Sequence, residues 1–179
     1  MEIAACIFII VFGTLGHFIF EWSGHKHWAG LLFAVNESTW EHIKLTIYPS
    51  FIWMAVEAAV LGFSRSLVAA QACSMCVTML LIPGLFYGYT AFTGQNWLIC
   101  DIICFCVSVI AGRICFSHVM CCAHISDLLL AASSVFLVLV LLCYLVFSFH
   151  PLHNFLFRDP ISGDYGPHGH GCHTHYHKI

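Results

Sequence analysis

The chain has 179 residues, of which 60% are hydrophobic and only 8% are charged. Soluble domains carry about 25% charged residues, so this composition excludes an ordinary soluble domain and predicts that the chain lies in lipid. A formal net charge of −3 without any basic run gives no support for a nucleic-acid partner, and we expect none.

Five stretches are apolar over about the 20 residues that a membrane helix needs. They are residues 3–20, 43–63, 67–91, 97–117 and 122–149. The connections near Ser64, Thr93 and His118 are short, which predicts antiparallel neighbours, and the short apolar run 31–35 is expected at the membrane interface. We therefore predict an all-α fold, an integral membrane bundle of about five transmembrane helices.

The first stretch is interpreted as a retained span and not as a cleaved signal peptide. It begins without a positive charge and leads into FEWSGHKHW, which lacks a small-residue cleavage site. His17 and Glu21 are four residues apart near its end, so they share one helix face. They are either part of a site or a pair near the lipid surface.

The stretch VNESTWEHIKL, residues 35–45, is polar at the start of the second span. Ser38 and Glu41 have the spacing of a capping box, in which each side chain accepts the other residue's backbone N–H. Asn36 is a second possible cap. Capping leaves three polar residues of this stretch without an explanation: Glu37, His42 and Lys44.

Glu57 lies deep in the second span, on the helix face that His42 begins. A carboxylate at membrane depth is costly and normally faces the bundle interior or a water-filled cavity. Glu57 is therefore either a buried structural carboxyl or a proton-coupling group.

The fourth and fifth spans also contain acidic residues near their starts. Asp101, in WLICDIICF, follows what looks like a first helical turn, so we interpret it as an inward-facing carboxylate. For the fifth span, Ser126 or Asp127 is predicted as the N-terminal cap.

Alternating spans bring many of these polar residues to one end of the bundle. The candidate ion- or solute-binding residues at that end are His17, Glu21, Asn36, Glu37, Glu41, His42 and Asp101, with Lys44 beside them. Those expected toward the other end are Glu57, Arg113, His118 and Asp127.

Basic residues predict the orientation. One side of a five-span bundle holds Lys26, Lys44, Arg158 and Lys178, and the other holds Arg65 and Arg113. The positive-inside rule makes the side with four basic residues cytoplasmic. We expect a multi-pass plasma-membrane protein with its N-terminus outside and its C-terminus in the cytoplasm.

Ten of the eleven cysteines lie in or beside apolar runs, where cysteine behaves as a small hydrophobe. Cys73 and Cys76 have CxxC spacing, but they lie in a hydrophobic helix without the βαβ context of a redox motif. We expect neither a disulfide framework nor a redox centre.

The end of the chain divides into two segments after the 1–149 transmembrane bundle. Residues 150–166 combine turn signals with apolar side chains and are expected to pack on the membrane face. Residues 167–179 are expected to form a flexible His-rich tail. Its candidate metal ligands are His168, His170, Cys172, His173, His175 and His177, although a disordered tail with incidental metal affinity is equally compatible.

Three segments resemble the signatures of a known family. They are GTLGHFIFEWSG (13–24), VNESTWEHIKL (35–45) and PLHNFLFRDPISGDYG (151–166). They are similar to those of a family of small bacterial multi-pass membrane proteins of unknown function. The resemblance implies an all-helical membrane protein that includes its C-terminal segment, and it implies no activity.

Three functions fit the polar residues. Imidazoles and carboxylates suit a divalent ion such as Zn, Mn, Fe or Ni, so the leading hypothesis is binding or transport of a metal ion or small solute. A metal-dependent hydrolase acting on lipid and a non-catalytic scaffold are the alternatives. The sequence has no HExxH, GxSxG or GxxxxGK[ST] pattern, so catalysis stays open, as does the oligomeric state.

Overall fold

The computed structural model describes residues 1–121 and 124–166, which contain six helices and no strand. The helices are α1 (Glu2–Trp22), α2 (His27–Leu32), α3 (Thr39–Leu61), α4 (Arg65–Thr93), α5 (Leu98–Met120) and α6 (Asp127–Phe147). All but α2 are long and apolar enough to cross a membrane. The prediction of an all-α membrane protein with five spans is confirmed.

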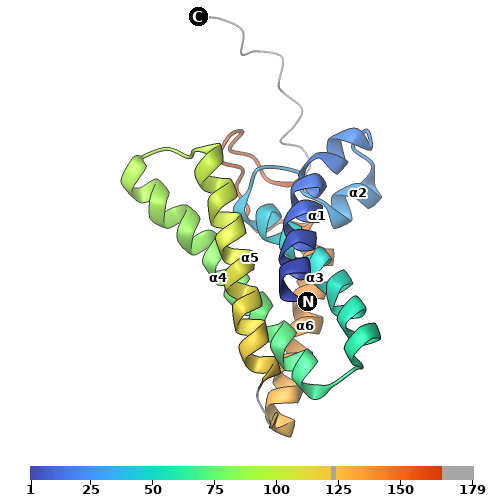
Figure 1. Ribbon diagram of the computed structural model, residues 1–179. Helices are drawn as coiled ribbons and strands as arrows, with labels where there is room; N and C mark the ends of the chain where they lie inside the picture. The colour runs from blue at the N-terminus through green and yellow to red at the C-terminus, as the bar shows by residue number, and fades with distance from the viewer. Residues whose placement is uncertain (122–123, 167–179) are drawn as a thin grey trace, which may run out of the picture.

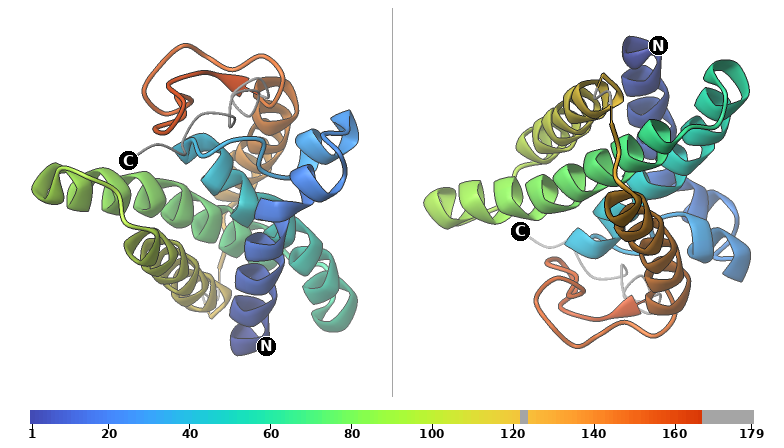
Figure 2. Two further views of the ribbon diagram at one scale, coloured as in Figure 1. Left: turned by 90° about the horizontal axis from the view of Figure 1, so that it is seen from above. Right: turned by 90° about the horizontal axis from the view of Figure 1, so that it is seen from below.

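Successive long helices run in opposite directions (Figure 1). The end of α1, the start of α3 and the start of α5 therefore meet at one end of the bundle, together with α2 and residues 148–166. We call this the α2 end. Seen along the bundle, α4 and α5 pack side by side, and the C-terminal segment crosses the α2 end near α6 (Figure 2).

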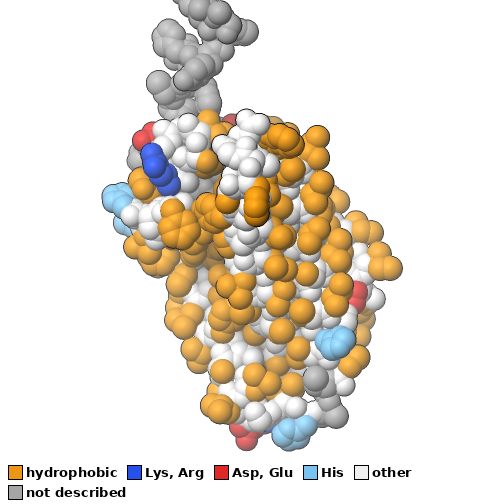
Figure 3. Space-filling view, turned by 90° about the vertical axis from the view of Figure 1, so that its left-hand side faces the viewer, with side chains coloured by type: hydrophobic (Ala, Val, Ile, Leu, Met, Phe, Trp, Pro, Cys, Tyr) orange, Lys and Arg blue, Asp and Glu red, His pale blue; other side chains and the backbone are white. Residues whose placement is uncertain are grey.

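The outer surface is apolar, as a lipid-facing surface must be. Large hydrophobic side chains of the spans are open to the surroundings, among them Ile3, Leu80 and Leu128. Figure 3 shows one face of the molecule, which hydrophobic side chains cover with few charged ones among them. A lipid bilayer is therefore the medium of these helices.

Serine caps begin three of the long helices. The hydroxyls of Ser38, Ser64 and Ser126 each accept the backbone N–H three residues further on, which confirms the predicted cap at Ser126. The predicted capping box at Ser38 is only half correct. The Ser38 N–H donates to Asn36 Oδ1 at 2.9 Å and not to Glu41, because the Glu41 carboxylate binds Lys44 instead.

Residues 150–166 pack on the α2 end through an aromatic stack. The Trp40 ring lies between Tyr144 and Phe157, with ring centroids 4.2 and 4.4 Å away. The backbone N–H of Trp40 also donates to the Leu156 carbonyl at 3.0 Å. The stack joins the start of α3 to the end of α6 and to the C-terminal segment.

All nine cysteines among the described residues are free, as their apolar surroundings predict.

Candidate metal site

A group of two histidines and one glutamate lies at the α2 end. His17 comes from α1, Glu37 from the loop before α3, and His42 from the first turns of α3. His17 Nε2 lies 3.1 Å from Glu37 Oε1, and His42 Nε2 lies 3.7 Å from Glu37 Oε2. One ligand atom from each residue lies within 4.8 Å of the others, and no other group of three such residues occurs in the part of the chain described.

Hydrogen bonds on both sides of Glu37 hold its backbone. Asn36 Oδ1 accepts the Ser38 N–H, and Asn36 Nδ2 donates to the Gly166 carbonyl at 3.1 Å. Glu37 therefore sits in a turn that is fixed to α3 and to the end of the C-terminal segment.

The hydrogen bond of His42 assigns its tautomer. Nδ1 lies 3.0 Å from the Ser38 carbonyl oxygen, which only accepts, so Nδ1 carries a proton. In a neutral ring Nε2 then presents a lone pair toward Glu37 Oε2, at a distance too long for a hydrogen bond. A backbone carbonyl that orients the distant nitrogen is the usual arrangement of a metal-binding histidine.

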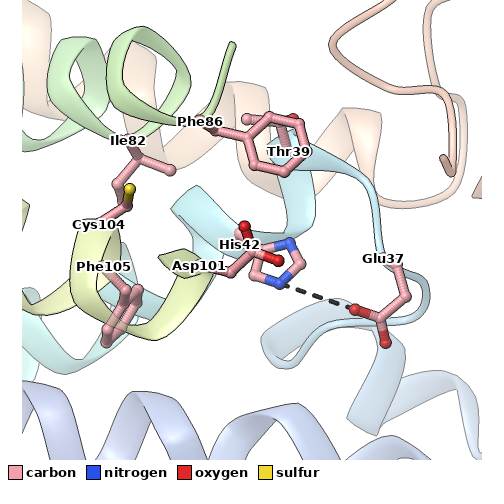
Figure 4. Close-up of a pocket in the computed structure, with 8 residues that line it drawn as sticks. All are labelled: Glu37, Thr39, His42, Ile82, Phe86, Asp101, Cys104 and Phe105. Carbon is pink, nitrogen blue, oxygen red and sulfur yellow. Dashed lines mark ion pairs between the residues drawn. The ribbon is translucent and has the colours of Figure 1, made fainter. Parts of the chain in front are cut away.

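The group opens into a pocket with a volume of about 200 Å³. His17, Glu37, His42 and Asp101 all line it, so four of the candidate residues share one cavity. A cavity needs roughly 10–15 Å³ by this measure to hold one water molecule, so the pocket has room for several. Figure 4 shows the adjoining pocket, where Asp101 from α5 lies near His42 and where the ion pair between His42 and Glu37 is marked.

Asp101 is held at the pocket wall by Tyr89. The Tyr89 hydroxyl donates to Asp101 Oδ1, and its oxygen accepts the Trp97 N–H at 3.1 Å. Nothing in the sequence marks Tyr89 as part of a site, because a tyrosine in an apolar helix is normally a packing residue.

Other candidate residues at the α2 end lie outside the group. Glu21 is exposed and lines a neighbouring cavity of about 150 Å³ together with His17, Asn36 and Glu37. Asn36 is buried and occupied by its two hydrogen bonds.

The Glu41 carboxylate is likewise engaged in structural contacts. Its Oε2 accepts the Val35 N–H at 3.0 Å and pairs with Lys44 Nζ at 2.5 Å. Lys44 also donates to the Gly30 carbonyl and to Ser148 Oγ. The sequence did not reveal these partners, since they lie on α2 and just after α6.

Glu57 lies at the opposite end of the bundle. Its Oε1 accepts hydrogen bonds from Trp53 Nε1 and from Arg113, which also pairs with Glu2. The expectation that Glu57 and Arg113 lie toward the same end is the sequence signal that points to this pairing. The proposed tail ligands, residues 168–177, lie outside the described residues.

Comparison with known protein families gives a match over nearly the whole chain. The model of a family described as a "Family of unknown function (DUF6512)" matches residues 2–167, nearly the whole chain. This agrees with the resemblance of the three signature segments. No curated protein and no solved structure matches the chain.

Proposed function

The chain belongs to this family of unknown function, the DUF6512 family, and we propose that it binds a divalent metal ion through His17, Glu37 and His42. The observation that carries the proposal is the convergence of three ligand atoms from three separate segments within 4.8 Å. The carbonyl of Ser38 supports it by orienting His42 Nε2 toward the same point.

Two imidazole nitrogens and one carboxylate oxygen suit zinc or iron(II) best. Zinc in catalytic sites has three protein ligands and one open position, and iron(II) is held by two histidines and one carboxylate with open positions. Ligand distances of about 2.0–2.2 Å require the three side chains to move slightly closer together. The open position would face the pocket that Asp101 lines.

Asp101 lines the pocket that the open metal position would face, so it can interact with a molecule bound there. Its Oδ1 accepts from Tyr89, which leaves acceptor capacity on the second oxygen. We assign it the role of accepting a hydrogen bond from a metal-bound water molecule.

The test is elemental analysis of the purified chain after exposure to zinc or iron(II). The His-rich tail would bind metal independently, so residues 168, 170, 172, 173, 175 and 177 are first replaced by serine in the full-length chain. One equivalent of metal is expected in this parent and less than a tenth of an equivalent in Glu37→Gln and His42→Ala.

His27→Ala is the matched control, because His27 is an exposed histidine at the same end of the bundle and lies outside the group. It should retain the metal. Equal metal contents in all four proteins would refute the proposed site.

A further inference from the structure

The pocket beside the proposed metal site, with a volume of about 200 Å³, has an opening lined by exposed apolar side chains. Phe18 of α1 and Leu98 and Ile102 of α5 line the pocket and are 43, 75 and 51% exposed. Both helices are candidate spans, so this opening faces the bilayer between α1 and α5.

Two of the three residues of the metal group lie within the spans, and Glu37 lies in the loop just before α3. His17 is five residues before the end of α1 and His42 is three after the start of α3, which corresponds to depths of about 7.5 and 4.5 Å at 1.5 Å per residue. The 21 residues of α1 span about 30 Å, which is the thickness of the hydrocarbon core. A ligand that enters from the side therefore needs an apolar part.

A second cavity lies between α1 and α5, closer to the other end of the bundle. It has a volume of about 450 Å³ and is walled mainly by isoleucines, Ile3, Ile7 and Ile10 of α1 with Ile110 and Ile114 of α5. Residues 3, 7, 10, 14 and 18 of α1 follow one another at steps of four, three, four and four, so one helix face lines both cavities.

The charges of the pocket favour a neutral ligand. A bound dication would be balanced by the carboxylates of Glu37 and Asp101, both of which line the pocket. A phosphate would add uncompensated negative charge there. A neutral oxygen donor, such as an ester carbonyl, would not.

We propose that the pocket takes an ester-linked membrane lipid from the bilayer, with an ester carbonyl oxygen at the open metal position and an acyl chain along the α1–α5 face. The inference rests on the proposed metal site and names the class of ligand that this site accepts. A lipid ligand would explain why the pocket beside a polar group that suits a metal ion opens between two lipid-facing helices.

Cobalt(II) bound in place of the natural metal provides the test, because its visible absorption changes when a ligand enters the open position. The full-length chain with the serine-substituted tail is loaded with cobalt in a maltoside detergent. It is then titrated with a diacyl lipid, with the diether lipid of the same chains, and with triacetin as a water-soluble ester.

The diacyl lipid is expected to shift the cobalt spectrum at a concentration at least tenfold lower than triacetin, and the diether lipid is expected to cause no shift. Equal effects of the two lipids, or no effect of the diacyl lipid on bound cobalt, would overturn the inference. An effect of triacetin at the same concentration as the lipid would assign the site to soluble esters. Failure of cobalt to bind would instead refute the metal site itself.

Two tryptophan variants test the route. Ile102→Trp fills the opening and is expected to raise the lipid concentration that gives half of the spectral shift by tenfold or more. Ile103→Trp is the matched control, because Ile103 is 54% exposed on the same helix and does not line the pocket. Equal responses of the two variants would show that the lipid does not enter between α1 and α5.

Discussion

Lys44 and Glu41 form a buried ion pair one helical turn apart, with 2.5 Å between Nζ and Oε2 and almost no exposure of either side chain. The Lys44 ammonium also reaches the Gly30 carbonyl at 2.9 Å and Ser148 Oγ at 3.2 Å. One cation therefore joins α3 to α2 and to the end of α6.

Lys44→Met is predicted to destabilise the protein strongly. The substitution leaves the Glu41 carboxylate buried without its counter-ion, and breaking a buried pair in this way costs about 3–5 kcal/mol. Denaturation in detergent measures the change in the free energy of unfolding. Arg65→Met is the control, because the Arg65–Asp127 pair is largely exposed and exposed pairs contribute about 0–1 kcal/mol. Similar losses in the two variants would contradict this account.

Asn36→Ala is predicted to weaken metal binding without removing a ligand. Asn36 holds the turn on both sides of Glu37 through Ser38 and Gly166. Loss of such orienting contacts typically lowers metal affinity about 10–100-fold. A competition titration with a zinc chelator measures this affinity, and an unchanged value would show that Glu37 is positioned without Asn36. Asn36→Asp, which keeps the acceptor for Ser38, should show a smaller loss.

The sequence predicted the spans because their length and hydropathy are local properties. Antiparallel alternation of those spans was then enough to expect His17, Glu37, His42 and Asp101 at one end of the bundle, where they share a pocket. Alternation gives the end at which a residue lies, but it does not give the direction of its side chain.

The direction of a side chain depends on partners that are distant in sequence. The sequence therefore does not show which of the other candidate residues face the pocket. From the sequence alone, Glu41 is as good a candidate ligand as Glu37. The structure shows that Glu41 instead pairs with Lys44 and accepts the Val35 N–H. Glu57 lies toward the predicted end of the bundle, but its link to Arg113 depends on α3 and α5 both packing against α1 and α4, which the sequence does not show.

Substitutions at Glu57 and Arg113 are predicted to separate stability from metal binding. Both side chains are buried at the end of the bundle opposite the proposed metal site. Arg113→Gln leaves Glu2 and Glu57 without their common cation and should lower the unfolding free energy by about 3–5 kcal/mol. Glu57→Gln should cost less, because Arg113 keeps its pair with Glu2. The metal content of folded Glu57→Gln should equal that of the parent, and a loss of metal there would connect the two ends.

Gly13→Ala is predicted to loosen the packing of α1. A Cβ atom at Gly13 would lie 2.7 Å from the Leu45 carbonyl oxygen and 2.8 Å from Phe105 Cζ. Since the oxygen belongs to the backbone of α3, α1 must move, and overpacking of this kind costs about 1–3 kcal/mol. Gly84→Ala is the control, because a Cβ there meets nothing within 4 Å. Thermal unfolding should show a lower midpoint for Gly13→Ala alone.

The C-terminus and the metal group are predicted to face the cytoplasm. Lys26 caps α2 and Arg158 belongs to the C-terminal segment, so both lie at the α2 end. At the other end Arg65 is exposed, whereas Arg113 is buried in ion pairs. More of the exposed basic residues therefore lie at the α2 end, and the positive-inside rule makes that end cytoplasmic. A fluorescent protein that matures only in the cytoplasm, fused after Ile179, should fluoresce, and a phosphatase active only outside should be inactive at the same position. The reverse pattern would place the proposed metal site on the external side of the membrane.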